Sequence, residues 1–261
     1  MTPSPIPKTQ YDNIASHYAS IEVLPGEMVA TKLLRNTVAN GPRDLKVLDL
    51  ACGTGTYARM LLDMGVAKHV VGVDISREMV QVGQVMEANR PDGSKRITFY
   101  VADCAAPLDH LSLAQESFDL VMGNWLFNYA SNRAELAGMW HNVATYLKPG
   151  GKYIGLQGNM YVEDHLKWDT KYGFKCTVTG ELENGRKLHA EASTEPKVEF
   201  DVYALEPGLY KEVPVELGMR EVTYREPSLQ DLPDVVGENM EFWENFLESP
   251  YCVLGTALKS E

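Results

Sequence analysis

The chain has 261 residues, of which 44% are hydrophobic, and its formal net charge is −12. This size fits one large domain or one domain with an insertion, and the acidic charge disfavours a nucleic-acid partner, because proteins that bind phosphate backbones usually present a basic surface. No apolar run approaches the roughly 18 residues that cross a bilayer, and the first ten residues lack an apolar signal core. The four cysteines are spread singly. We therefore expect a cytoplasmic protein with no membrane partner.

The first part of the chain alternates helix and strand patterns. Helical spacing over residues 11–39 predicts an N-terminal helix, which Gly41 and Pro42 close. Strands are expected at residues 46–50, 69–73, 97–102, 118–122 and 152–156, and the helices between them at 56–64, 77–89 and 132–147. Ser76 is a suitable N-cap of the helix over 77–89. Apolar strands that alternate with amphipathic helices predict a doubly wound, mostly parallel α/β sheet.

The pattern changes after residue 158. Asn184 and Gly185 predict a two-residue hairpin turn, and residues 197–205 continue as a strand. A helix is expected over 207–217, and segments 220–224 and 252–258 complete a seven-stranded core sheet with an antiparallel edge. The resulting division is an N-terminal helical lid (1–43), a cofactor-binding Rossmann-like core (44–158), a β-hairpin insertion that caps the substrate (159–205) and a C-terminal completion of the sheet (206–261).

A glycine-rich turn follows the first core strand, in VLDLACGTGTYA over residues 47–58. By itself it also fits the G-x-G-x-x-G/A pattern of dinucleotide-binding proteins, so an NAD(P)-dependent oxidoreductase stays open at this point. Ligands of open α/β sheets bind beyond the carboxyl ends of the strands, where Gly53 and Gly55 would let the backbone approach a ligand closely. Asp74, about 20 residues later, is placed to accept the hydroxyl groups of an adenosine ribose.

Two further acids separate the possible cofactors. Asp49 precedes the glycines, where a carboxylate would repel a pyrophosphate but attract the ammonium group of an amino acid. Asp103 can accept the adenine amino group while the backbone N–H of Cys104 meets a ring nitrogen. A pocket with these carboxylates suits a sulfonium cofactor, which predicts S-adenosylmethionine.

Five motifs occur in a fixed order: VLDLACGTG, VVGVDIS, VADC, FDLVMGNW and LKPGGKYI. This series resembles class I S-adenosylmethionine-dependent methyltransferases over about residues 44 to 156. The opening YDNIASHYAS resembles the start of small-molecule enzymes of the toxoflavin-synthase-like and ubiquinone-methyltransferase-like groups. The hairpin and the ending EFWENFLESP resemble the toxoflavin-synthase-like group. The resemblance implies a Rossmann-like fold, S-adenosylmethionine as cofactor and S-adenosylhomocysteine as product.

The resemblance also implies which residues contact the cofactor. It places Tyr11 and Tyr18 in a lid near the methionine part, although both could instead be core contacts of an amphipathic helix. The backbone carbonyl of Asn124 matches the position that holds the methionine amino group, and Met79 is placed to cover the adenine or to pack in its helix. The expected cofactor-binding set is Tyr11, Tyr18, Asp49, Ala51, Gly53, Gly55, Asp74, Ile75, Met79, Asp103, Cys104 and Asn124.

The methyl acceptor is less defined. Candidates to face it are Trp125, Asn128, Tyr129, Gln157 and Tyr161, and candidates for a general base are His17, Tyr129 and His165. No recognisable catalytic pair exists, and a neutral amine or an ionised hydroxyl needs no base. Residues 123–126 read GNWL and lack the N-P-P-Y-like motif of enzymes that methylate adenine amino groups. No carboxylates have the spacing of a magnesium site, so no metal is expected.

These observations predict methyl transfer to a nitrogen or oxygen atom of a small, aromatic or heterocyclic metabolite. One alternative is a protein of the same fold that binds the cofactor without transferring its methyl group, either directing a cyclisation or pericyclic reaction or acting as a binding protein. The oligomeric state, monomer or homodimer, stays open.

Overall fold

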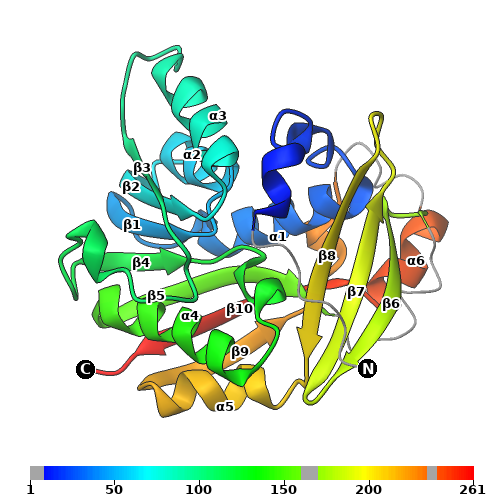
Figure 1. Cartoon of the computed structure of the whole chain (residues 1–261). Helices are drawn as coiled ribbons and strands as arrows, with labels where there is room; N and C mark the ends of the chain where they lie inside the picture. Colours follow the sequence, from blue (N-terminus) through cyan, green and yellow to red (C-terminus); the bar gives the residue numbers. More distant parts are fainter. Residues whose placement is uncertain (1–8, 160–169, 234–239) are drawn as a thin grey trace.

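The structure is a computed structural model that describes residues 9–159, 170–233 and 240–261. Its core is a seven-stranded sheet in the order β3-β2-β1-β4-β5-β10-β9 (Figure 1). The strands are β1 (Leu45–Leu50), β2 (Ala67–Asp74), β3 (Ile97–Val101), β4 (Phe118–Met122), β5 (Leu147–Gly158), β9 (Met219–Arg225) and β10 (Cys252–Lys259). Strands β1 to β5 pair in parallel, and β10 runs antiparallel between β5 and β9. The doubly wound, mostly parallel sheet is confirmed.

Helices cover both faces of this sheet. They are α1 (Pro25–Ala39), α2 (Thr56–Asp63), α3 (Arg77–Ala88), α4 (Arg133–Tyr146), α5 (Leu209–Glu216) and α6 (Met240–Glu248). In β1, Leu48 and Leu50 point to the core formed with α4 and α5, while Val47 points to the core formed with α1, α2 and α6. Alternate residues of one strand are therefore buried on opposite faces, which explains its continuous apolar character. No helix in the described part of the chain is both long and apolar enough to span a bilayer.

The continuous N-terminal helix expected over residues 11–39 is wrong. The segment forms two 3-10 turns, η1 (Gln10–Asn13) and η2 (Tyr18–Ser20), and α1 begins only at Pro25. Proline disfavours a helical conformation of the residue before it, and Leu24 is extended with ψ of 142°. Pro25 suits the first turn of a helix because no backbone N–H is needed there. Helical periodicity continued across this break, so it did not reveal where the helix starts.

A separate three-stranded antiparallel sheet has the order β6-β7-β8 and lies beside the core (Figure 1). Its strands are β6 (Phe174–Leu182), β7 (Gly185–Ala192) and β8 (Val198–Leu205). The expected hairpin is present, but its turn residues are Glu183 and Asn184, one position earlier than predicted. Gly185 opens β7 instead, where a Cβ atom would lie 2.2 Å from the carbonyl oxygen of Ala204 in β8. The close approach of β8 to β7 at this point therefore leaves no room for a side chain at residue 185.

Helix α6 was not predicted as an element. Its Trp243 and Phe246 are fully buried, and both pack against Tyr172, with ring centroids 5.8 and 5.0 Å apart. The Tyr172 hydroxyl donates a hydrogen bond to the carbonyl oxygen of Phe242 at 2.6 Å. Short helices give little periodic signal, and this one is held in place by tertiary packing of its aromatic residues.

Candidate functional site

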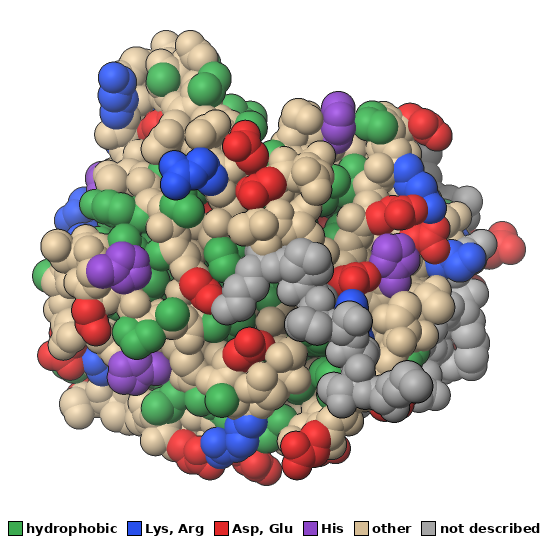
Figure 2. Space-filling view, in the orientation of Figure 1, with side chains coloured by type: hydrophobic (Ala, Val, Ile, Leu, Met, Phe, Trp, Pro, Cys, Tyr) green, Lys and Arg blue, Asp and Glu red, His purple; other side chains and the backbone are tan. Residues whose placement is uncertain are grey.

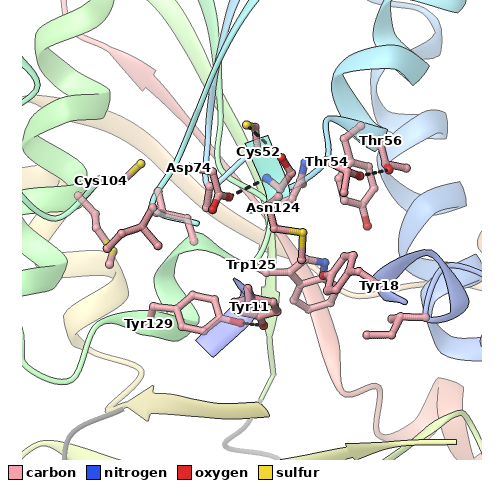
Figure 3. A pocket seen from close by; sticks show the side chains of 18 of the residues that line it. Tyr11, Tyr18, Cys52, Thr54, Thr56, Asp74, Cys104, Asn124, Trp125 and Tyr129 are labelled. Carbon is pink, nitrogen blue, oxygen red and sulfur yellow. Dashed lines mark hydrogen bonds between the residues drawn. The ribbon is translucent and has the colours of Figure 1, made fainter. Parts of the chain in front are cut away.

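A cavity of about 220 Å³ opens at the carboxyl ends of β1, β2 and β4, beneath the N-terminal turns. The order of strands reverses between β1 and β4, which is the usual ligand position in an open α/β sheet. Figure 3 shows Asp74, Cys52, Thr54 and Asn124 on one side of this cavity, and Tyr11, Tyr18, Trp125 and Tyr129 on the other. Most of the residues expected at the cofactor line it: Tyr11, Tyr18, Ala51, Gly53, Asp74, Ile75, Met79, Asp103, Cys104 and Asn124. Asp49 and Gly55 do not line it.

Asp74 organises the glycine turn as well as facing the cavity. Its Oδ2 accepts a hydrogen bond from the backbone N–H of Gly53 at 2.7 Å, and its Oδ1 accepts one from the N–H of Ser76 at 2.9 Å. Burial raises the pKa of Asp74, and these two hydrogen bonds oppose that rise. The carboxylate therefore joins the end of β2 to the turn that follows β1.

The two glycines of the turn have different reasons to be glycine. Gly53 has φ of +53° and lines the cavity, and a Cβ atom there would meet nothing within 4 Å. Gly55 has φ of +88°, and its Cβ atom would lie 2.9 Å from Cζ of Phe99, away from the cavity lining. The left-handed backbone favours glycine at both positions, and close packing against Phe99 of β3 is a further reason at Gly55 alone.

Two buried polar atoms lie near the turn without a partner. Oδ2 of Asp49 and Nδ2 of Asn124 have no hydrogen bond within the described residues, although the side chains are only 2% and 4% exposed. The Asn124 Oδ1 accepts a hydrogen bond from the N–H of Leu156 at 3.0 Å, which fixes this side chain beside the cavity. Burial and the nearby charge of Asp74 raise the pKa of Asp49 well above its ordinary value. An ammonium group at this end would offset the burial of an ionised Asp49.

The opposite end of the cavity is shaped by the loop after β3. Asp103 accepts a hydrogen bond from the N–H of Ala105 at 2.9 Å. Asn142, which is 1% exposed, donates from Nδ2 to the carbonyl oxygens of Cys104 and Ala106 at 2.9 and 2.8 Å. Sequence reasoning missed Asn142, whose only signal is an amide on the buried face of α4. It holds the loop that carries Asp103.

The N-terminal segment, residues 10–22, closes over the cavity. Ser76 Oγ donates to Asp12 Oδ1 at 2.5 Å, and Thr56 Oγ1 donates to Glu22 Oε1 at 2.7 Å. The hydroxyl groups of Tyr11 and Tyr129 hydrogen bond to each other. Three side-chain hydrogen bonds thus tie this segment to the core. The predicted lid covered residues 1–43; from here on the lid means residues 10–22.

A second cavity of about 60 Å³ lies between the lid, α1 and the three-stranded sheet. Of the predicted acceptor residues, Trp125, Asn128 and Tyr129 line it, and Trp125 and Tyr129 also line the larger cavity. Asn128 is fixed there because its Oδ1 accepts a hydrogen bond from the N–H of Gly158 at 3.0 Å. Burial raises the pKa of the Tyr129 hydroxyl, so this group is neutral at ordinary pH.

Two further acceptor candidates line neither cavity. His17 is exposed and lines neither cavity, and Gln157 is buried and lines neither. Tyr161 and His165 lie outside the described residues.

Glu27 was missed by sequence reasoning although it lines both cavities. It is 8% exposed, and burial raises its pKa to about 8. The signal that indicates it is helical spacing: Glu27, Ala30 and Leu34 share the buried face of α1. An acidic residue on an apolar stripe is unusual unless it is paired or functional.

Comparison with known proteins identifies this arrangement. Residues 47–151 match the family described as "Methyltransferase domain". This part of the chain is a methyltransferase domain. It is of class I, and S-adenosylmethionine is its cofactor, which confirms the family resemblance and the cofactor predicted from the motifs. The nicotinamide alternative is not supported.

Three similar proteins illustrate the range of the methyltransferase domain. Protein arginine N-methyltransferase 1 of Chlamydomonas reinhardtii is 24% identical over 185 residues, which cover 66% of this chain and 52% of the relative. Demethylmenaquinone methyltransferase of Symbiobacterium thermophilum is 32% identical over 168 residues, which cover 60% of this chain and 62% of the relative. The CcbJ methyltransferase of Streptomyces caelestis shares the fold with a TM-score of 0.63 at 15% identity. The superposition covers 97% of this chain and 98% of that protein. The aligned part spans about half the length of the arginine methyltransferases that it matches.

The two glycines of the turn give a first prediction about the methyltransferase domain. Gly55→Ala is expected to lower the free energy of unfolding by about 2 kcal/mol. Alanine is strained in the left-handed conformation of this residue, and its Cβ atom would also clash with the ring of Phe99. Gly53→Ala should cost only about 1 kcal/mol but should weaken S-adenosylhomocysteine binding about tenfold by placing a methyl group at the cavity. Urea unfolding and calorimetric titration of both variants measure the two effects. The opposite ranking would contradict the separate roles.

Asp49→Asn should change stability and cofactor affinity in opposite directions. Asparagine removes a carboxyl group whose pKa burial raises well above its ordinary value, so at neutral pH, where the unfolded state has lost this proton, the free protein should become more stable. Loss of the charge should weaken S-adenosylhomocysteine binding about tenfold, because attraction to the ammonium group is lost. Thermal unfolding and calorimetry test this, with the exposed Asp109→Asn as the matched control. Unchanged affinity would remove Asp49 from the site.

Proposed function

We propose that the protein transfers a methyl group from S-adenosylmethionine to a nitrogen or oxygen atom of a small aromatic or heterocyclic metabolite. The observation that carries this proposal is the junction of the two cavities. Tyr11, Tyr18, Trp125 and Tyr129 line both, so an acceptor in the smaller cavity would lie next to a cofactor in the larger one. The smaller cavity is bordered by further aromatic rings, including Phe174 and Phe200, which suit a flat apolar body.

When bound, the cofactor supplies a methyl group on a sulfonium, and the electron pair of the broken C–S bond stays on sulfur. In this proposal the chain holds Asp74 at the ribose hydroxyl groups and Asp49 toward the ammonium group, and it aligns a nucleophile about 3 Å from the methyl carbon. The lid excludes water through its contacts at Ser76, Thr56 and Tyr129. Such a reaction needs little further protein chemistry when the nucleophile is already unprotonated.

Surface charge and cysteine state support the small-molecule class and a cytoplasmic location in this proposal. On the face shown in Figure 2, Lys and Arg side chains are interspersed with Asp and Glu, whereas binding to a phosphate backbone favours a basic stripe. All four cysteines are free, as is common in a reducing compartment. The named relatives act on different acceptors, so the acceptor class rests on the second cavity. In the proposed division of the chain, the insertion over 159–205 is the substrate cap, and its described residues Tyr172, Phe174, Cys176, Ala190, Phe200 and Val202 line that cavity.

Mass spectrometry of turnover tests the proposed function. The protein is incubated with S-adenosylmethionine and a panel of aromatic and heterocyclic amines, phenols and alcohols. Methyl transfer gives a product heavier by one methylene group together with an equal amount of S-adenosylhomocysteine. Conversion of an acceptor without that mass gain would instead show a non-methylating reaction, and absence of cofactor binding would overturn the proposal.

A further inference from the structure

Glu27 is a buried carboxylate at the boundary between the two cavities. It lies in the first turn of α1, directly after Pro25 and Gly26, and it lines both cavities. Its Oε1 accepts a hydrogen bond of 3.3 Å from the hydroxyl group of Tyr251, which comes just before β10. No other hydrogen bond and no ion pair of Glu27 is found within the described residues.

Within the part of the chain that the structure describes, the groups that surround Glu27 do not include a cation. Those close enough to influence its charge are Glu22 and Tyr18 of the lid, Tyr57 of α2, Tyr129 of η4 (Leu126–Tyr129), and Tyr251 and Cys252 at the start of β10. All are acids or neutral groups. Among the described residues that line the second cavity there is no Lys, Arg or His, and Glu27 is the one carboxylate. A buried carboxylate without a positive partner favours a positive ligand.

Besides the charge of Glu27, the second cavity has aromatic walls that suit a cation. Its walls carry aromatic rings from four regions: Tyr11 in η1, Trp125 beside η4, Phe174 in β6 and Phe200 in β8. Aromatic faces attract an ammonium group and also pack against a flat ring. Glu22, the other carboxylate nearby, is already engaged by Thr56 and lines only the larger cavity. Glu27 is thus placed to meet the charged end of an acceptor whose ring fills the cavity.

We propose that the methyl acceptor is a primary or secondary amine attached to a flat apolar ring, and that Glu27 binds its ammonium form and accepts its proton. This inference rests on the proposed function and narrows its acceptor class. In the proton transfer, one N–H bond breaks, the proton moves to a carboxylate oxygen of Glu27, and the electron pair remains on nitrogen. That lone pair is the nucleophile for the methyl group. Glu27 acts here as a general base in a water-excluded site.

A proton count gives a direct signature of this role. Burial raises the pKa of Glu27 to about 8, so the side chain is largely protonated at neutral pH in the unliganded protein. A cation that binds beside it must expel this proton, because only the carboxylate stabilises the positive charge. Binding of an ammonium probe near pH 7 should therefore release about one proton, whereas a neutral probe of the same shape should release none.

Calorimetric titration of the full-length protein loaded with S-adenosylhomocysteine tests the proposal, with benzylamine as the cationic probe and benzyl alcohol as the neutral one. Benzylamine is expected to bind at least about tenfold more tightly, with release of about one proton as measured in buffers of different ionisation enthalpy. Glu27→Gln should abolish both the preference and the proton release. Glu244→Gln, which changes an exposed glutamate of α6, should leave both unchanged.

Each result decides one question. Equal binding of the two probes, no binding of either probe, or a preference that survives in Glu27→Gln would overturn the amine assignment. Proton release is measured in the unaltered protein, so that part of the test stands even if the variant folds poorly. Failure of S-adenosylhomocysteine itself to bind would overturn the proposed function instead, and that titration is performed first.

Discussion

Replacing Asp74 by alanine is expected to weaken S-adenosylhomocysteine binding by about a hundredfold, or about 3 kcal/mol. Two losses combine in this variant. The carboxylate can no longer accept the ribose hydroxyl groups, and the N–H groups of Gly53 and Ser76 lose their acceptor. Without these hydrogen bonds the glycine turn should be less ordered, and ordering it when the cofactor binds adds to the free-energy cost of binding. Calorimetric titration measures the effect directly.

Two further variants separate these contributions of Asp74. Asp74→Asn keeps one acceptor oxygen and the shape of the side chain, so its loss of affinity should be smaller than that of the alanine variant. Asp109→Ala removes an exposed carboxylate on the loop after β3 and should bind normally. An Asp74→Ala protein with the affinity of the unaltered chain would show that the ribose lies elsewhere.

The stability of the free protein should depend on pH through Glu27. Its pKa is raised from 4.5 to about 8 by burial, so between these values the folded state keeps a proton that the unfolded state has lost. The stabilising contribution is complete below 4.5 and is lost as pH rises through about 8. Relative to Glu27→Gln, the free energy of unfolding should fall by as much as ~4 kcal/mol between about pH 5 and about pH 9.

Urea unfolding across this pH range measures the difference between the unaltered protein and Glu27→Gln. Asp49 and Asp74 also have raised pKa values because of burial, but they are present in both proteins and their contribution cancels in the comparison. Glu244→Gln provides the control for loss of one surface charge and should follow the unaltered protein. Parallel curves for the unaltered protein and Glu27→Gln would show that the carboxyl is not protonated in the folded state.

The core sheet was predictable because each strand is a short apolar run bounded by turn residues. The fourth strand has the predicted limits, residues 118–122, and Ser76 caps α3 by accepting a hydrogen bond from the N–H of Met79. The order of the motifs also placed Asp74 and Asn124 at the same edge of the sheet, because parallel strands end together there. Local patterns and topology agree in this region, so the sequence alone is sufficient.

What the sequence did not reveal depends on contacts between distant segments. The lid lacks the predicted continuous helix, yet its two tyrosines meet at the cavity, with ring centroids 5.7 Å apart. Helix α6 is defined by packing against Tyr172, about 70 residues earlier. Glu27 is buried beside Tyr251, which is distant in the sequence, so no local pattern predicts this contact. The acceptor side of the site is built almost wholly from such long-range contacts.

The lid is also joined to the small sheet. The Gln10 side chain exchanges two hydrogen bonds of 2.9 Å with the backbone of Asp201 in β8, so its amide occupies the position of a neighbouring strand. Tyr11, the next residue, borders both cavities. Displacement of this segment would therefore open both cavities to solvent together. Under the proposed function, departure of the demethylated cofactor and departure of the product would then be coupled.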